Sequence, residues 1–144
     1  MDNTWVLVAN ASEAHLYATE RLGEEMSVVK DYEHPQSRAK GTSLASDKPG
    51  SYQGYGSSRG SMGDAVDPKT YEAERFADEL ANELDRGRTA NAYRRLALVA
   101  EPHFQGLLKA HLNEHTRALV VNSINKDFTA CNALELPTRL KGCL

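Results

Sequence analysis

The stretch LALVAEPHFQGLLKAHLNEHTRALVV, residues 96–121, decides the fold. It begins with a continuous apolar run, Leu96–Ala100, and ends with another, Ala118–Val121, which extends toward Ile124. Such runs are typical of strands buried on both faces. Between them, Glu101-Pro102 opens a helical pattern whose apolar stripe also carries two histidines: Phe104, Leu107, Leu108, His111, Leu112 and His115. A strand, a helix and a strand in this order predict two parallel strands joined by a right-handed crossover.

The first part of the chain predicts an antiparallel meander. Trp5–Ala9 is another continuous apolar run, and short turns separate it from strand-like segments at His15–Thr19 and Met26–Tyr32. Short connections favour antiparallel neighbours. With the parallel unit, the order β-β-β-α-β-α-β-α predicts an α/β fold, a mixed sheet of about five strands covered by helices. All 144 residues fit one domain, 1–144.

The strongest helix signal follows Asp67-Pro68. Asp67 is a preferred capping residue, and Pro68 suits the first helical position. Apolar residues then recur on one face, at Ala73, Phe76, Ala77, Leu80, Ala81 and Leu84. We interpret the acids on the other side as a solvated face: Glu72, Asp78, Glu79, Glu83 and Asp85. Gly87 is expected to end the helix.

A long polar segment separates the meander from this helix. Residues 35–67 read PQSRAKGTSLASDKPGSYQGYGSSRGSMGDAVD, with six glycines and no apolar periodicity, so we expect a flexible loop. Runs of this length in compact domains are usually functional or disordered. Its cations and rings predict contact with RNA or another anionic surface, through Arg38, Lys40, Lys48 and Arg59 on phosphates and Tyr52 and Tyr55 stacked on bases. A solvated loop without a partner is the alternative.

Composition bounds the class of protein. Hydrophobic residues make up 40% and charged residues 26%, as in an ordinary soluble domain. The formal net charge of −3 argues against a surface coated throughout with nucleic acid. The apolar runs are too short to cross a bilayer, and no basic region precedes the first of them, so a secretory signal is not expected. Cys131 and Cys143 have no metal-ligand spacing. We expect a cytoplasmic protein with no cofactor and no metal.

Polar residues follow two of the predicted parallel strands. They are Glu101, His103, Lys126 and Asp127. The carboxyl ends of parallel strands meet at one edge of a sheet, so these side chains are candidates for one rim, which would suit a small hydrolase. Asp127 is also a candidate cap for a last helix, which is expected to begin at Asp127 or Thr129, to run through Leu134 and to be disturbed by Pro137. Both interpretations remain open.

Two weaker candidates have structural interpretations. His111 and His115 lie four residues apart, a spacing that suits a metal-binding helix, but no third ligand accompanies them. We therefore interpret them as partly buried packing histidines. Cys131 lies near the expected start of the last helix, where a helix dipole lowers a thiol pKa, but it has no partner in the sequence. An inert cysteine is the favoured interpretation.

Five segments together resemble the bacterial host-attachment protein family. They are TWVLVANASEAHLY (4–17), HPQSRAKGTSLASDKPGS (34–51), EAERFADELANEL (72–84), RRLALVAEPHFQGLLKAHL (94–112) and KDFT (126–129). The family is similar in turn to the middle domain of archaeal and eukaryotic peptide release factors, which implies a ribonuclease-H-like fold. That domain carries a Gly-Gly-Gln loop before its long helix. The nearest stretch here is Tyr52-Gln53-Gly54-Tyr55, so the resemblance assigns no catalytic residue.

These observations lead to one main hypothesis and two alternatives. The main hypothesis is a non-enzymatic binding protein, associated with RNA on the ribosome or with tRNA through residues 35–67. The first alternative is a protein-interaction module in host-cell attachment or its regulation. The second is a small hydrolase that uses the rim after the parallel strands. A homodimer paired through an exposed edge strand is a further expectation.

Overall fold

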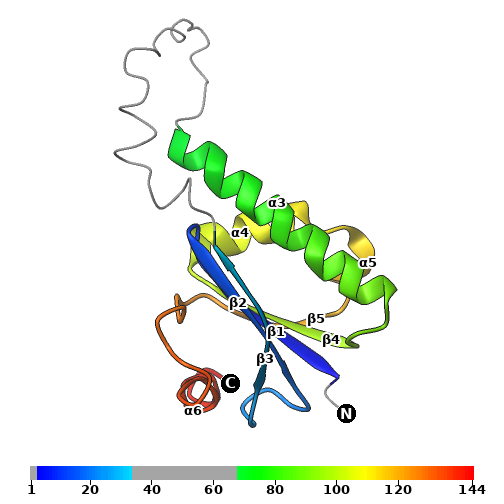
Figure 1. The fold of residues 1–144 in the computed structure, drawn as a ribbon, viewed down its shortest axis with the longest axis vertical. Helices are drawn as coiled ribbons and strands as arrows, with labels where there is room; N and C mark the ends of the chain where they lie inside the picture. The colour runs from blue at the N-terminus through cyan, green and yellow to red at the C-terminus, as the bar shows by residue number, and fades with distance from the viewer. Residues whose placement is uncertain (1–2, 34–67) are drawn as a thin grey trace, which may run out of the picture.

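The computed structural model describes residues 3–33 and 68–144, which form a mixed sheet with helices on both faces (Figure 1). This is the α/β architecture that the sequence predicts. The elements are β1 Thr4–Ala9, β2 Glu13–Thr19, β3 Ser27–Glu33, α3 Pro68–Thr89, β4 Arg95–Ala100, α4 Pro102–His111, α5 Glu114–Arg117, β5 Val120–Ile124 and α6 Leu136–Lys141. The capping role expected of Asp67 lies outside the described residues.

The sheet combines the two predicted units. Its five strands lie in the order β3-β2-β1-β4-β5. β1 pairs antiparallel with β2, and β2 with β3, while β1, β4 and β5 run parallel. β1 is the central strand, with Thr4 opposite Thr19 of β2 on one side and Arg95 of β4 on the other. The predicted meander and the predicted parallel crossover are both confirmed.

The continuous apolar character of β1 arises because helices cover the sheet on both sides. Val6, Leu7 and Val8 are all buried. Leu7 faces the core under α3 and α4, whereas Val6 and Val8 face a second core under α6. Successive strand residues point to opposite faces, so a strand covered on both sides needs apolar residues at every position.

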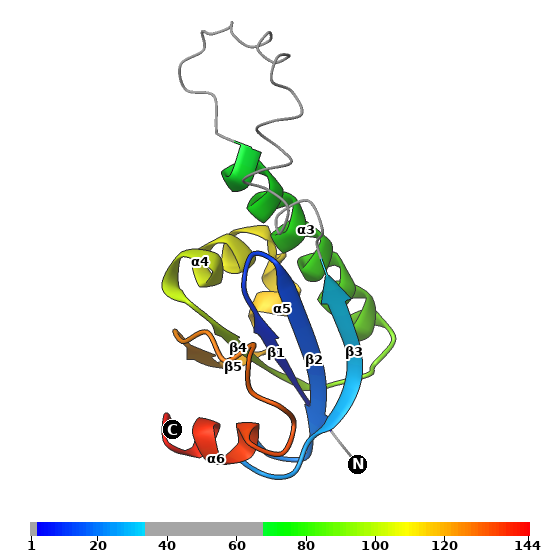
Figure 2. The same ribbon diagram turned by 60° about the vertical axis from the view of Figure 1, so that its left-hand side comes forward.

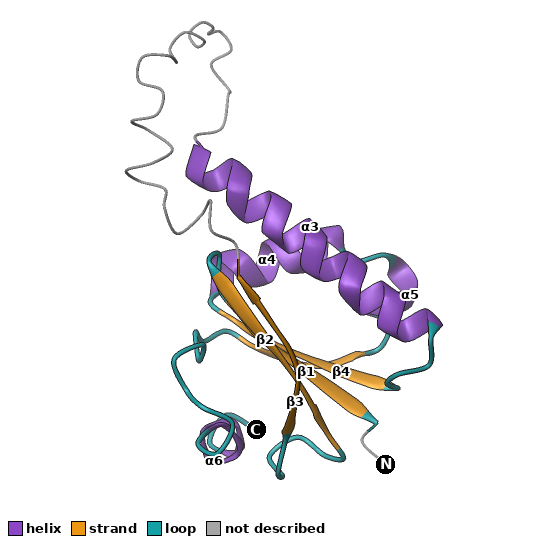
Figure 3. Ribbon diagram, viewed as in Figure 1, coloured by secondary structure: helices purple, strands orange, loops and turns teal. Residues whose placement is uncertain are grey.

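The larger core lies between the sheet and the α3–α4 pair, which Figure 3 shows packed on the same face. Phe76 of α3 and Phe104 of α4 meet there with ring centroids 6.0 Å apart. On the other face, the segment after β5 crosses the sheet and leads to α6 (Figure 2). Leu136 and Leu140 of α6 join Phe128 in covering that side.

The predicted position of the last helix is wrong, because α6 begins at Leu136. Asp127 holds a tight turn instead, in which the Thr129 N–H donates to its carboxylate at 3.0 Å. Pro137 lies in the first turn of α6, where its missing N–H leaves no helical hydrogen bond unmade. Cys131 is half-buried in the segment before α6, not at the start of a helix.

Gly87 does not end α3, which continues to Thr89. A Cβ atom at Gly87 would lie 2.5 Å from the Trp5 ring, so glycine lets the ring pack against the helix. Trp5 in turn stacks on Tyr93 with ring centroids 4.7 Å apart. The chain reverses after the helix at Asn91, which has a φ of 59°. The sequence signal at Gly87 therefore marks a close contact.

His111 and His115 do not share one helical stripe, and 30% of the His111 side chain is exposed. The expected stripe from Phe104 to His115 is split, because α4 ends at His111 and α5 is a separate turn. His111 and His115 are both exposed. His111 Nδ1 lies 3.4 Å from Asp78 Oδ1 of α3, so this histidine forms a surface ion pair when it is protonated.

The acidic face of α3 is solvated only in part. Asp78 and Glu79 are exposed, as predicted. Glu72 is buried, with 7% of its surface exposed, and its Oε2 lies 3.8 Å from Arg75 Nη1. Glu83 accepts a hydrogen bond from β3, and Asp85 accepts one from α5. These two acids attach the helix to its neighbours.

Candidate functional site

Polar residues gather at one edge of the sheet, where several strands end together. β1, β4 and β5 are parallel and are followed by Asn10, Glu101 and Asn125. β3 also ends at this edge, because its last residue, Glu33, lies opposite Glu13 at the start of β2. Such an edge is where open α/β sheets commonly bind ligands. It is therefore the first place to look for a site.

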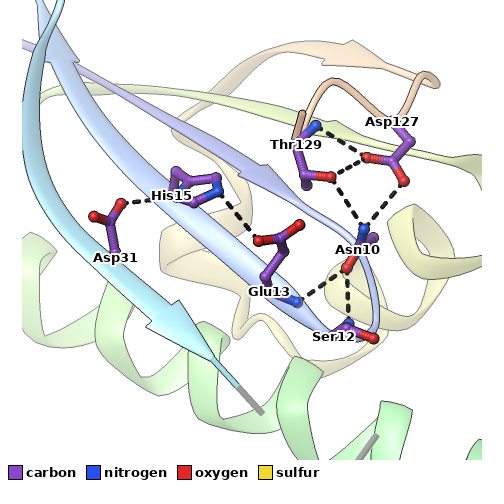
Figure 4. A network of polar contacts seen from close by, with 7 residues as sticks. All are labelled: Asn10, Ser12, Glu13, His15, Asp31, Asp127 and Thr129. Carbon is purple, nitrogen blue, oxygen red and sulfur yellow. Dashed lines mark hydrogen bonds and ion pairs between the residues drawn. The ribbon is translucent and has the colours of Figure 1, made fainter. Parts of the chain in front are cut away.

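Asn10 is the centre of this cluster (Figure 4). Its Oδ1 accepts hydrogen bonds from the N–H groups of Ser12 and Glu13 at 2.8 and 2.9 Å, which closes the β1–β2 hairpin. Its Nδ2 donates to Asp127 Oδ2 and to Thr129 Oγ1, both at 3.1 Å. One amide side chain thus ties the hairpin to the segment after β5. We call these five residues the Asn10 cluster.

Asp127 is held from two sides within the Asn10 cluster. The Thr129 N–H and hydroxyl donate to Oδ1 at 3.0 and 2.7 Å, and Asn10 donates to Oδ2. Burial alone would raise the pKa of Asp127, but the hydrogen bonds from Thr129 and Asn10 outweigh it and lower that pKa below its ordinary value. The carboxylate is therefore ionised at neutral pH, and each of its oxygens accepts at least one hydrogen bond.

A histidine lies beside this cluster on β2. His15 Nδ1 is 2.7 Å from Asp31 Oδ1 of β3, and His15 Nε2 is 3.7 Å from Glu13 Oε1 (Figure 4). The short contact with Asp31 holds the imidazole ring with Nδ1 toward that carboxylate. The other ring nitrogen faces a carboxylate. The arrangement joins β2 to β3 and places the histidine ring between two carboxylates.

The predicted rim is only partly assembled. Asp127 lies at the sheet edge as expected and bonds to Asn10. Glu101 caps α4, accepting from the His103 and Phe104 N–H groups at 2.8 and 3.1 Å. Its carboxylate therefore serves the helix terminus. His103 and Lys126 are exposed. The contact residues predicted in the 35–67 segment lie outside the described residues.

The Asn10 cluster suits a rigid support better than a reaction centre. The Asn10 amide bonds to Asp127, to Thr129 and to two backbone N–H groups, and Asp127 also accepts from Thr129. Within residues 3–33 and 68–144, no group of three His, Cys, Asp or Glu side chains is placed to hold a metal ion. Nor is any helix in these ranges long and apolar enough to span a bilayer.

Sequence reasoning found Asp127 but missed Asn10, Thr129 and the His15–Asp31 pair. A usable signal was present for Asn10, because it directly follows the buried run of β1 as Glu101 follows that of β4. Applying the same carboxyl-end argument to the first strand would have named it. The His15–Asp31 pair depends on the register of β2 against β3, which short turns did not determine.

Comparison with known proteins agrees with the resemblance seen in the sequence. A search of curated proteins found no match. The family described as "Protein required for attachment to host cells" matches residues 5–140. This range includes all five strands, apart from the first residue of β1, and it also includes most of α6. The match thus covers the whole sheet edge with the Asn10 cluster. The chain belongs to this host-attachment family.

Proposed function

We propose that this member of the host-attachment family is a non-enzymatic binding protein that associates with RNA, on the ribosome or as tRNA, through residues 35–67. One observation carries the proposal. The described chain ends at Glu33 and resumes at Pro68, and β3 reaches the sheet edge where β1, β4 and β5 also end. β3 therefore ends at the edge where open α/β sheets commonly bind ligands.

The charge distribution supports the same assignment. In the sequence, the segment carries Arg38, Lys40, Lys48 and Arg59, and its two tyrosines are Tyr52 and Tyr55. Basic side chains neutralise phosphates, and aromatic rings stack on unpaired bases. The chain as a whole is acidic, with a formal net charge of −3. Nucleic-acid contact is therefore expected to concentrate on a local group of cations.

Alanine replacement of those four basic residues tests the proposal. We expect the affinity for tRNA, measured by fluorescence anisotropy, to fall at least about tenfold. The slope of log affinity against log salt should become shallower by about three to four, because each lost phosphate contact removes about one. Ribosome cosedimentation should fall in parallel.

A matched control keeps the change in charge but moves its location. Alanine at four exposed basic residues of the described part should leave RNA affinity unchanged: Arg21, Arg94, Lys126 and Lys141. Unaltered tRNA binding and ribosome cosedimentation in the 35–67 variant would refute the proposal. Equal losses in both variants would show non-specific attraction and would refute it as well.

A protein-interaction module is the second candidate, and exposed apolar side chains on β3 favour it. This edge strand exposes Val28 and Val29. Attachment to host cells, which the family description names, involves macromolecular partners. Affinity capture from cells with and without RNase separates the two candidates. Partners that survive RNase and include no ribosomal protein support the second.

The engagement of the rim carboxylates argues against a hydrolase. Glu101 caps α4, and Asp127 is hydrogen-bonded to Thr129 and Asn10. Protonation of either carboxylate during a reaction would weaken the structural hydrogen bonds that it accepts. The strand order β3-β2-β1-β4-β5, with an antiparallel meander followed by a parallel crossover, supports the finer proposal of a ribonuclease-H-like domain similar to that of release factors.

A further inference from the structure

We infer that the outer edge of β5, with the cations around it, binds an extended acidic segment of a partner protein. β5 is the last strand of the sheet on the side opposite β3 and, within the described chain, pairs only with β4. An edge strand leaves backbone N–H and C=O groups available to an added strand. The residues of this surface all lie between Arg95 and Lys126, so the inference does not depend on RNA binding through residues 35–67.

The chain on both sides of β5 is described, and it runs away from the outer edge of the strand. Before β5, Thr116 of α5 donates to Asp85 of α3 at 3.1 Å, which directs α5 toward α3. After β5, Asp127 and Thr129 accept hydrogen bonds from Asn10 at the end of β1. Because β4 lies between β1 and β5, the chain leaves β5 toward the middle of the sheet (Figure 2). Neither neighbouring segment covers the outer edge.

β5 lacks the usual protection of an edge strand. Natural sheets place charged residues or proline on their edges, which discourages pairing with other chains. Residues 118–125 contain neither, whereas β3 at the other edge has three charged residues. Val121 is 53% exposed, and Ser123 is exposed as well. The strand therefore presents one apolar and one small side chain beside its outer backbone groups.

A register shift defines which part of this edge is regular. Val121 is an extra residue on β5, because the residues on either side of it pair with neighbouring residues of β4. From Asn122 to Ile124 the two strands are in step again. An added strand therefore finds a regular edge from Asn122 to Ile124 and meets the exposed Val121 side chain at its start.

Three exposed cations surround the strand. Arg117 precedes β5, and Lys126 follows it. Arg95 of β4 lines the same surface hollow as Val121. Together with the two exposed residues of the strand, these cations form what we call the β5 edge surface: Arg95, Arg117, Val121, Ser123 and Lys126.

The charges of these cations are available to a partner. Arg117 Nη2 donates to two backbone carbonyls at the end of α4, at 2.9 and 3.1 Å, which fix the guanidinium without neutralising it. Within residues 3–33 and 68–144, none of the three cations forms an ion pair with a carboxylate. The nearest acids in the sequence are Glu114 and Asp127, and hydrogen bonds hold Asp127 in the Asn10 cluster. The β5 edge surface is therefore cationic, on a chain whose formal net charge is −3.

Charge complementarity selects the occupant. An extended segment with aspartate or glutamate at its ends places these acids near Arg117 and Lys126, while its backbone pairs with β5. RNA can meet the same cations, but it has no backbone N–H and C=O groups for a strand edge. A second copy of this chain fits less well, because pairing two β5 strands about a twofold axis brings the cations of both copies together. The structure therefore points to an acidic partner strand.

A synthetic peptide tests this surface on the full-length protein. Its core alternates threonine and valine and is as long as β5, 5 residues, with glutamates at both ends. One control peptide has lysines at the ends, and another has a central proline that blocks strand pairing. We expect the acidic peptide to bind, measured by calorimetry, and both controls to bind at least about tenfold more weakly. Equal binding of either control, or no binding of the acidic peptide, would overturn the inference.

Two variants locate the binding surface. Val121→Glu should weaken the acidic peptide at least about tenfold, whereas Val28→Glu, at a 54% exposed valine on the opposite edge strand β3, should not. If Val121→Glu fails to fold by circular dichroism, Lys126→Glu serves instead and should also weaken the peptide. Equal effects at Val121 and Val28, or no effect of either β5 variant, would overturn the inference.

The same variants separate this inference from its rivals. Transfer RNA binding should be unchanged in Val121→Glu, so failure of the RNA proposal and failure of the peptide proposal are seen independently. Displacement of the acidic peptide by tRNA would show a general anion-binding surface and overturn the partner strand. Sedimentation of the unmodified protein tests the second copy. A dimer that Val121→Glu dissociates would assign the edge to self-association and overturn the acidic partner.

Discussion

The Asn10 amide donates a hydrogen bond of 3.1 Å to Asp127, although the two residues are 117 positions apart in the chain. The contact joins the first hairpin to the segment that follows the last strand. It forms because β1 and β5 run parallel and end at the same sheet edge. This sheet edge therefore connects the β1–β2 hairpin to the segment after β5.

Replacing this amide should destabilise the whole fold. Asn10→Ala removes two bonds to the hairpin backbone and two to the segment after β5. Each is worth about 0.5–1.5 kcal/mol, and exposed members lie at the lower end, so we expect a loss of about 2–3 kcal/mol in chemical denaturation. Asn125→Ala, at an exposed neighbour, is the control. A loss below about 0.5 kcal/mol for Asn10→Ala would contradict the assigned role.

The Asp127 carboxyl should show a depressed pKa that depends on Asn10. Burial opposes the depression, while hydrogen bonds from Thr129 and Asn10 cause it. A lowered folded-state pKa stabilises the protein above the ordinary carboxyl pKa of about 3.9. That contribution is lost as the pH falls through the folded-state value. Carbon-detected NMR titration should find the pKa of Asp127 higher in Asn10→Ala than in the unmodified protein. An identical pKa in both would argue against the bond.

Gly87 should be far less tolerant than Gly106, although both lie within helices. A Cβ at Gly87 would meet the Trp5 ring at 2.5 Å, whereas one at Gly106 has no neighbour within 4 Å. We expect Gly87→Ala to cost about 1–3 kcal/mol through overpacking. Gly106→Ala should gain about 0.5–1 kcal/mol, since alanine favours the helix. Thermal unfolding of the two variants compares them directly, and equal melting temperatures would rule out the close contact.

Tyr93 should make the protein sensitive to alkali. Burial is the main cause that raises the pKa of Tyr93 to about 12, and its hydroxyl donates to the Leu84 carbonyl at 2.6 Å. Because the folded-state pKa is raised, protonated Tyr93 contributes fully to the stability of the fold below the ordinary pKa of about 10. That contribution is lost as the pH rises from about 10 to about 12. Tyr93→Phe should flatten the fall in stability over that window. The free energy of unfolding, measured from denaturation curves at several alkaline pH values, tests this. The same slope of that free energy against pH in both proteins would contradict the prediction.

Much of the fold was predictable from local patterns, because strands and helices covered by a core repeat their apolar residues at fixed periods. The run Leu96–Ala100 predicted a strand buried on both sides, and β4 is buried from Leu96 onward. The helical face containing Phe76 and Leu80 was also correct. Errors arose where one residue type serves two roles. Gly87 suits a helix end as well as a ring contact, and Asp127 caps a turn as readily as a helix.

The sequence by itself determined the α/β class, the order of the main elements and membership of the host-attachment family, since periodicity and family motifs are local properties of the chain. Only the tertiary structure decided which side chains meet. Asn10 bonds to Asp127, and His15 to Asp31, because strand order and register place them together. The register shift between Leu16 and Tyr17 likewise places Val28 of β3 opposite Tyr17. Pairing between distant segments is a property of the folded sheet, which no local pattern encodes.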